Sequence, residues 1–159
     1  KGRKNQKAYR KNNLEKCRVR NQRHNARKRG MFDTLTQSEW QRCLAYWHYS
    51  CAVCGNQWGF AWTLSADHWI PISHAFCPGT IAENIIPLCH GRGGCNNTKR
   101  HTLPDVWLVK RLGPRKARQK LQEIHQYFGW VTTQKLANSQ KKPDQLQSSA
   151  IDPDAPQES

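Results

Sequence analysis

The chain has 159 residues, of which 26 are Lys or Arg and 11 are Asp or Glu, giving a formal net charge of +15 at pH 7. This length suits one domain with a modest core, and the charge favours a polyanionic partner, nucleic acid before basic ribosomal or membrane-surface roles. Because it lacks a run of about 18 apolar residues and an N-terminal secretory pattern, we expect a cytoplasmic protein with no membrane partner.

Residues 1–30 form a basic segment that holds half of the Lys and Arg residues and one acidic residue, Glu15. Good helix formers dominate it and Gly30 is a plausible helix end, but Tyr9, Leu14 and Val19 are too few for a packed face. We predict a basic N-terminal arm or helix that becomes ordered on a phosphate backbone, with a merely solvated or disordered arm as the alternative. The residues expected to contact nucleic acid are Arg18, Arg20, Arg23, Arg27, Lys28 and Arg29.

A short amphipathic helix is predicted after this segment. Thr36 and Glu39 have the spacing of a capping box, which marks a helix start. Apolar residues follow at the intervals of one helical face, namely Trp40, Cys43, Leu44 and Trp47. We expect this helix to dock on a core, with Cys43 as a buried apolar side chain.

The seven cysteines are arranged like a metal framework rather than a disulfide scaffold, with two close pairs, Cys51–Cys54 and Cys89–Cys95. A C-x-x-C knuckle lets two thiolates reach one tetrahedral ion, and the glycine-rich residues 90–94 allow the second pair to fold back. We predict a structural zinc bound by all four, contributing on the order of 10 kcal/mol to folding. The alternatives are unpaired core cysteines, or a mixed site in which Cys77, His90 or His48 replaces one of the four.

Polar residues with catalytic potential interrupt the apolar segments between and after these pairs. Asp67 and His68 are neighbours in the run Leu64 to Ser73, and on a strand their side chains would serve different partners. Asn84 precedes the apolar residues that lead to Cys89, and Asn96 follows Cys95 at the start of a predicted helix.

Two helices are predicted after this region, over residues 104–112 and 114–128, each with a proline in its first turn and a glycine, Gly113 or Gly129, at its end. From about Asn138 the chain is polar and is expected to be disordered. The predicted organisation is therefore a basic arm over 1–30, one domain over 31–130 with its core at 51–100, and a polar tail over 131–159.

The order Asp-His, Asn-x-x-x-Leu-Cys, Cys-Asn-x-x-Lys resembles the HNH nuclease family in its zinc-containing, small stand-alone form. The resemblance covers about residues 51–99, where six features agree in order and spacing. It departs from the family in the long gap between Cys89 and Cys95 and in the loop over residues 74–83, which lacks the usual Gly-Gly.

This resemblance implies an α+β fold, a ββα-metal (His-Me finger) core with a four-cysteine structural zinc, flanked by helices. It implies a bacterial or phage endonuclease that hydrolyses DNA phosphodiester bonds with one Mg²⁺ or Mn²⁺ held by Asp67 and Asn96. His68 would be the general base, since a neutral imidazole accepts a proton. Asn84 would steady the loop and orient His68. RNA is not excluded as the substrate, and the oligomeric state is left open.

Simpler interpretations exist for several of these residues. Asn96 could cap a helix, Asn97 could compete with it for the metal, and Asn84 could be an ordinary turn residue. Lys99 and Arg100 are expected to contact phosphate, with plain solvation as the alternative. Trp58, Trp62 and Trp69 are expected in the core or a pocket wall. The rival functions are a non-catalytic zinc module that binds DNA or RNA, and a ribosome-associated RNA-binding protein.

Overall fold

The computed structural model describes residues 13–57, 59 and 63–140, without the side chains of Leu14, Glu15 and Arg18. Predictions about residues 1–12, Trp58, Trp62 and residues 141–159 lie outside this range. The elements follow in the order α2 (Leu14–Arg27), α3 (Gln37–Tyr46), β1 (Thr63–His68), the 3-10 helix η1 (Ala82–Asn84), β2 (Ile85–His90), α4 (Cys95–Lys99), α5 (Pro104–Leu112) and α6 (Pro114–Gln140). The protein is therefore an α+β fold.

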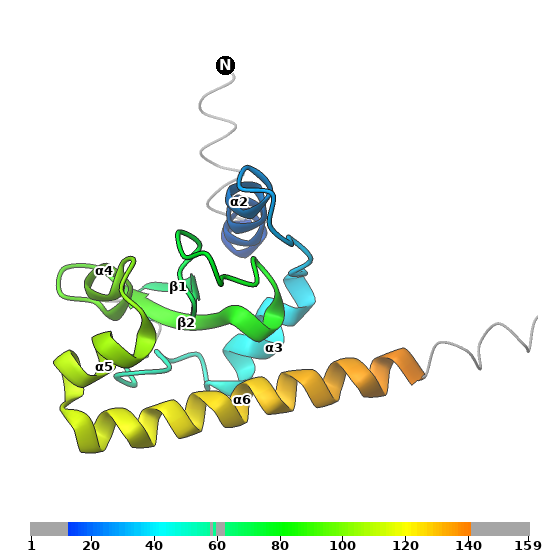
Figure 1. The fold of residues 1–159 in the computed structure, drawn as a ribbon. Coiled ribbons are helices and arrows are strands. Elements are labelled where there is room, and N and C mark those ends of the chain that lie inside the picture. The colour runs from blue at the N-terminus through cyan, green and yellow to red at the C-terminus, as the bar shows by residue number, and fades with distance from the viewer. Residues whose placement is uncertain (1–12, 58, 60–62, 141–159) are drawn as a thin grey trace, which may run out of the picture.

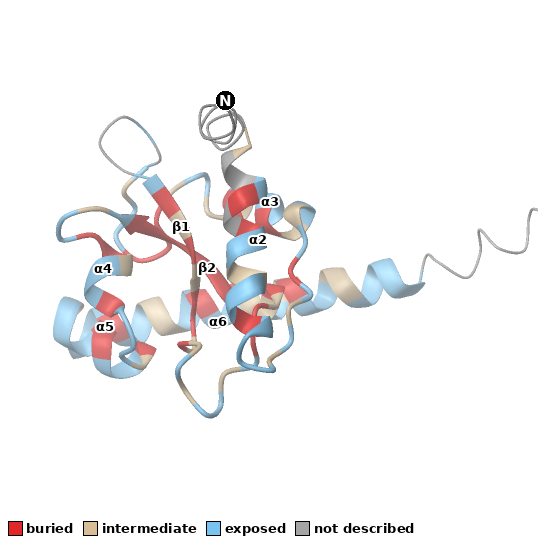
Figure 2. Ribbon diagram, turned by 90° about the horizontal axis from the view of Figure 1, so that it is seen from above, coloured by how far each residue is buried: buried red, intermediate tan, exposed pale blue. Residues whose placement is uncertain are grey.

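A two-stranded antiparallel sheet lies at the centre of the molecule (Figure 1). Its register pairs Thr63 with His90 at one end and His68 with Ile85 at the other. β1 alternates between buried and more exposed positions, whereas β2 is buried at every position but its last. Helices cover both sides of β2, which explains its continuous apolar sequence, and Figure 2 shows the buried residues gathered around these strands.

The start of α3 confirms the predicted capping box. The Thr36 hydroxyl accepts from the Glu39 backbone N–H, and the Glu39 carboxylate accepts from the Thr36 backbone N–H at 2.7 Å. Trp40, Cys43 and Leu44 are buried on the face that packs against the sheet and α6. The capping box therefore sets the register in which this face meets the core.

The predicted end of the last helix at Gly129 is wrong, because α6 continues to Gln140. Val131 is buried and Trp130 packs against the core, and these contacts outweigh the weak helix propensity of a single glycine. The predicted polar tail therefore begins too early, and the far part of α6 projects beyond the body (Figure 1). Although α6 is the longest helix, neither it nor any other helix among the described residues is apolar enough to cross a membrane.

The expectation that the basic helix lacks a packed face is also wrong. α2 buries Cys17, Val19 and Ala26, and the Gln22 side chain donates to the Ala66 carbonyl of β1 at 2.7 Å. The small side chains complete a face that a count of large apolar residues misses. Figure 1 shows α2 and α6 on opposite sides of the sheet, so the basic helix is an integral layer of the domain.

Candidate metal and nucleic-acid sites

The four paired cysteines come together as predicted. The Sγ atoms of Cys51, Cys54, Cys89 and Cys95 all lie within 4.8 Å of one another. A tetrahedral zinc with Zn–S bonds of about 2.3 Å requires sulfurs about 3.8 Å apart, so this set could hold a metal ion such as zinc. None of the alternative ligands, Cys77, His90 and His48, belongs to this set of four among the described residues.

Two glycine-containing turns build this cluster. Gly55, with φ of 74°, lets the knuckle after Cys51 fold back so that the Cys51 N–H reaches the Asn56 carbonyl. At the second pair, a Cβ atom on Gly94 would lie 2.6 Å from the Cys89 carbonyl oxygen. Only glycine permits this approach without a shift, and the approach brings the start of α4 against the end of β2.

The electrostatics of the cluster favour a bound cation. Hydrogen bonding from Cys95 lowers the pKa of the Cys51 thiol to about 5, and the same bond raises the pKa of Cys95. Burial raises the pKa of Cys89 to about 11. Four thiols this close cannot all ionise without a balancing positive charge, which a divalent soft-ligand metal supplies.

A second group of polar residues lies where β1 ends beside α4. The Asn96 side-chain amide donates to Asp67 Oδ1 at 3.0 Å, and the Lys99 ammonium lies 2.7 Å from Asp67 Oδ2. Lys99 also donates to the His68 carbonyl at 2.6 Å and is completely buried. Burial raises the pKa of the Asp67 carboxyl, and the Lys99 charge opposes that rise. The helix begins after Gly94, so Asn96 is not its N-cap.

The position of Lys99 departs from the expected phosphate contact. On so short a helix, the sequence does not reveal that residue 99 faces the end of β1. Its aliphatic stem and ammonium are enclosed, and the charge is used to hold Asp67 and the β1 carbonyl. Arg100, which follows it, is exposed.

The orientation of His68 follows from a chain of hydrogen bonds. Its Nε2 lies 2.8 Å from the Thr80 hydroxyl, and that hydroxyl donates to the Gln22 carbonyl in α2 at 3.1 Å. Because the hydroxyl proton points to Gln22, the Thr80 oxygen accepts from His68, so Nε2 carries the ring proton. The lone pair is then on Nδ1. Burial, together with the Lys99 charge, lowers the pKa of His68 to about 4, and the ring is neutral at pH 7.

Asn84 makes several hydrogen bonds to the loop that follows β1. Its side-chain oxygen accepts from the Ile70 N–H at 2.8 Å, and its side-chain nitrogen donates to the carbonyls of Ile70 and Gly79. The Asn84 carbonyl also accepts from the Trp69 N–H, directly after His68. These contacts exceed those of an ordinary turn residue.

Asp67, His68 and Asn96 line one cavity of about 420 Å³, hereafter the Asp67 cavity. Sequence reasoning missed several of its neighbours. Gln22 and His101 also line it, and the His101 ring lies 3.2 Å from the Ser73 hydroxyl. No spacing pattern marks Gln22 or Thr80, because their contacts join segments that are far apart in the chain. His101 could have been noticed from its place just after the Asn-x-x-Lys motif.

No protein-family model, no curated protein and no solved structure matches this chain. The assignment of a function therefore depends on the site itself.

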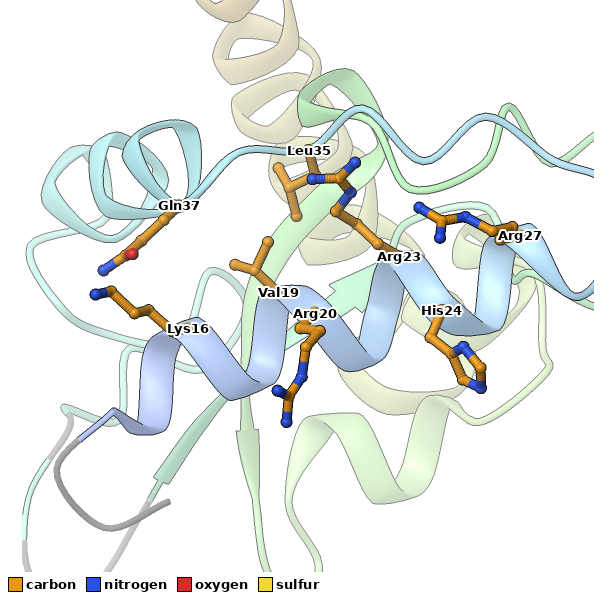
Figure 3. Close-up of a pocket in the computed structure, with 8 residues that line it drawn as sticks. All are labelled: Lys16, Val19, Arg20, Arg23, His24, Arg27, Leu35 and Gln37. Carbon is orange, nitrogen blue, oxygen red and sulfur yellow. The ribbon is translucent and has the colours of Figure 1, made fainter. Parts of the chain in front are cut away.

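Three of the α2 residues predicted to contact nucleic acid, Arg20, Arg23 and Arg27, line a hollow of about 380 Å³ between α2 and the start of α3 (Figure 3). Lys16 and Gln37 point toward one another across it, and Arg23 lies beside Leu35. Arg20 points to another side of the helix. The side chain of Arg18 lies outside the described residues.

These cations differ in how they are held. Arg27 forms a 2.6 Å ion pair with Asp33, and Arg23 lies 3.8 Å from the same carboxylate. Arg29 donates weakly to the Ile72 carbonyl at 3.5 Å, whereas Arg20 and Lys28 are exposed. α2 therefore presents a positively charged surface that Asp33 neutralises only in part.

Proposed function

We propose that this protein is an HNH-type endonuclease that hydrolyses DNA phosphodiester bonds at the Asp67 cavity, on a ββα-metal core formed by β1, β2 and α4. The observation that carries the proposal is that Asp67, His68 and Asn96, chosen on motif order, line one cavity beside a four-cysteine cluster. The same strand–strand–helix unit supplies all three side chains, since β1 holds Asp67 and His68 and α4 holds Asn96.

The donors at this cavity suit a hard divalent ion. A carboxylate and an amide oxygen are ligands for Mg²⁺ or Mn²⁺, and Asp67 Oδ1 lies within hydrogen-bond distance of the Asn96 amide. When bound, such an ion would stabilise the negative charge that develops on the phosphate during hydrolysis. Lys99 already neutralises part of the Asp67 charge, so we expect weak affinity for the cation until a phosphate adds its oxygens.

His68 is suited to act as the general base. The Thr80 hydroxyl holds the ring in the tautomer whose Nδ1 accepts a proton, and the lowered pKa keeps that nitrogen unprotonated at neutral pH. Nδ1 takes the proton of the attacking water, while Lys99 and Asn84 hold the backbone at His68 and directly after it. The cysteine cluster has no reacting role and anchors the start of α4 instead.

The test incubates supercoiled plasmid with the full chain and Mg²⁺ or Mn²⁺. Removing a general base typically slows a reaction by about 10²–10⁴-fold, so His68→Ala should remove nearly all nicked and linear product. The matched control is His125→Ala, an exposed histidine on α6, which should cut like the wild type. Equal cleavage by His68→Ala and wild type would exclude His68 as the base. No cleavage with either metal would favour the non-catalytic zinc module, and a labelled RNA in parallel distinguishes an RNA substrate.

A further inference from the structure

A second, larger hollow adjoins the Asp67 cavity. This hollow, hereafter the α5 groove, has a volume of about 660 Å³ and lies between α4 and α5. Asn97 and Arg100 line both hollows, so the two meet at the end of α4. A polymer whose backbone is cut in the first hollow would find the second directly beside it.

The α5 groove has the chemistry of a phosphodiester site. Its lining includes three cationic side chains and two hydroxyl side chains, namely Arg100, Lys110, Arg111, Thr98 and Thr102. No acidic residue is among the described residues that line it. Val106 adds an exposed apolar surface, 58% accessible, that suits contact with sugars rather than with charged groups.

Two of the cations are held in place before any ligand arrives. Arg111 donates to the Thr98 hydroxyl at 3.2 Å and to the Gly93 carbonyl at 3.3 Å. Arg100 has φ of 50°, an uncommon conformation for a residue other than glycine, and its Nε donates to the Asn97 carbonyl. Such backbone strain gathers at functional sites. Here it turns the chain so that Arg100 lies at the junction of the two hollows.

A nucleic acid cut within its length must extend in both directions from the cleaved bond. α2 offers one basic surface, and its Gln22 lines the Asp67 cavity. The α5 groove offers the other through Asn97 and Arg100, and α2 and α5 lie well apart in both ribbon views (Figures 1 and 2). Cations therefore flank the cavity on two sides, as an internal cut requires.

We propose that the α5 groove binds the DNA backbone on one side of the cleaved phosphodiester, while α2 binds it on the other. The placement relative to the cut rests on the proposed function, but binding in the groove does not. Phosphate contacts of this kind position a substrate without reading its sequence.

Binding is tested with the full chain carrying His68→Ala, so that a fluorescent DNA duplex stays intact. Lys110→Glu is compared with Lys116→Glu, an exposed lysine of α6 that lines neither hollow and gives the same change in net charge. We expect Lys110→Glu to weaken binding by about tenfold more than Lys116→Glu, and Lys110→Gln to reduce the salt dependence by about one phosphate contact. Equal losses of DNA affinity in Lys110→Glu and Lys116→Glu would overturn the proposal that the α5 groove binds DNA, because only the change in net charge would then matter.

The direction of the substrate is tested by placing a photo-crosslinking residue at Val106 or at Arg20. Crosslinks from the two positions should fall on opposite sides of the cleavage point, and crosslinks on the same side would overturn the proposal.

The cleavage and binding assays distinguish the two proposals. If the wild type does not cut DNA but Lys110→Glu still binds DNA more weakly than Lys116→Glu, the proposed nuclease function fails and the proposed binding in the α5 groove stands. If the wild type cuts DNA and the two lysine variants bind DNA equally well, the nuclease function stands and binding in the α5 groove fails. If Lys110→Glu weakens binding of RNA while DNA does not bind, the ligand of the groove is RNA and the proposal of DNA is overturned.

Discussion

The cysteine cluster and the Asp67 cavity are neighbours, joined where Cys95 is followed by Asn96 at the start of α4, yet they are built in opposite ways. The cluster has four soft ligands drawn close together, three of them buried. The Asp67 cavity has a carboxylate, an amide and an imidazole around open volume, with Lys99 behind them. A closed set of thiolates suits a structural ion, and an open set of oxygen ligands suits exchange with a substrate. Breaking the first should unfold the protein, whereas changes around the second should cost less stability and leave the domain folded.

Cys95→Ser is expected to have the largest effect. It removes one of four ligands and, with it, a metal contribution on the order of 10 kcal/mol, which is comparable to the whole stability of a small domain. Elemental analysis should find the zinc lost, and circular dichroism should show no cooperative thermal transition. Cys17→Ala, a buried cysteine outside the cluster, should keep the metal and the transition. A Cys95→Ser protein that melts like wild type would contradict the structural role.

Lys99→Met should have the next largest effect on stability. It tests how far the structure around the Asp67 cavity depends on a buried charge. It leaves Asp67 without its 2.7 Å partner, and removing one member of a buried pair costs about 3–5 kcal/mol. Urea unfolding measures the loss. The double variant Asp67→Asn/Lys99→Met should recover part of the stability, because no charge is then unpaired. Wild-type stability in Lys99→Met would mean that the ion pair contributes nothing.

Thr80→Val keeps the shape of a fully buried side chain and removes the hydroxyl between His68 and Gln22. Leaving such buried groups without partners should lower the free energy of unfolding by about 1–3 kcal/mol. Nitrogen-15 shifts of the His68 ring should move away from the Nε2–H tautomer, and Thr80→Ser should restore them. An unchanged tautomer in Thr80→Val would show that the ring is held by other contacts.

Gly94→Ala should have an effect no larger than that of Thr80→Val and tests how tightly the cluster sets α4. The new Cβ would lie 2.6 Å from the Cys89 carbonyl oxygen, a backbone atom of β2, so the chain around residue 94 must shift, and we expect a loss of about 1–3 kcal/mol. Thermal melting and a zinc competition assay measure it. Gly59→Ala is the control, since its Cβ would meet nothing within 4 Å and should leave both readings unchanged.

The clustering of the four cysteines could be predicted, because thiolate metal ligands occur at characteristic spacings. That Asp67, His68 and Asn96 line one cavity could be expected from the order of the motifs, whereas their chemical roles stay predictions. The direction of Lys99 could not, because a short helix can present residue 99 to solvent or to the strand, and only the packing of β1 decides. The hydrogen bonds of Thr80 and Gln22 could not be predicted from the sequence for a related reason. Their roles depend on a hydroxyl and a backbone carbonyl from remote segments, and neither group leaves a pattern in the sequence.

The boundaries failed where tertiary contacts overrode local preference. Gly129 looks like a helix end, yet the neighbours Trp130 and Val131 pack into the core and carry α6 through it. α2 looked too polar to pack, yet Cys17 and Ala26 are small enough to lie against the domain. The charge of α2 was readable from composition, but its attachment was not.

The attachment of α2 through Gln22 has a consequence for how such a protein can change over time. The inward positions, Val19, Gln22 and Ala26, support the strand and the loop behind His68 and tolerate little substitution. Among the outward basic positions that the structure describes, Arg20 is exposed, and Arg27 makes a surface ion pair with Asp33. Mutation can therefore change the charge of the outer face while the inner face keeps β1 and the loop behind His68 in place, so the two faces of a single helix can vary separately.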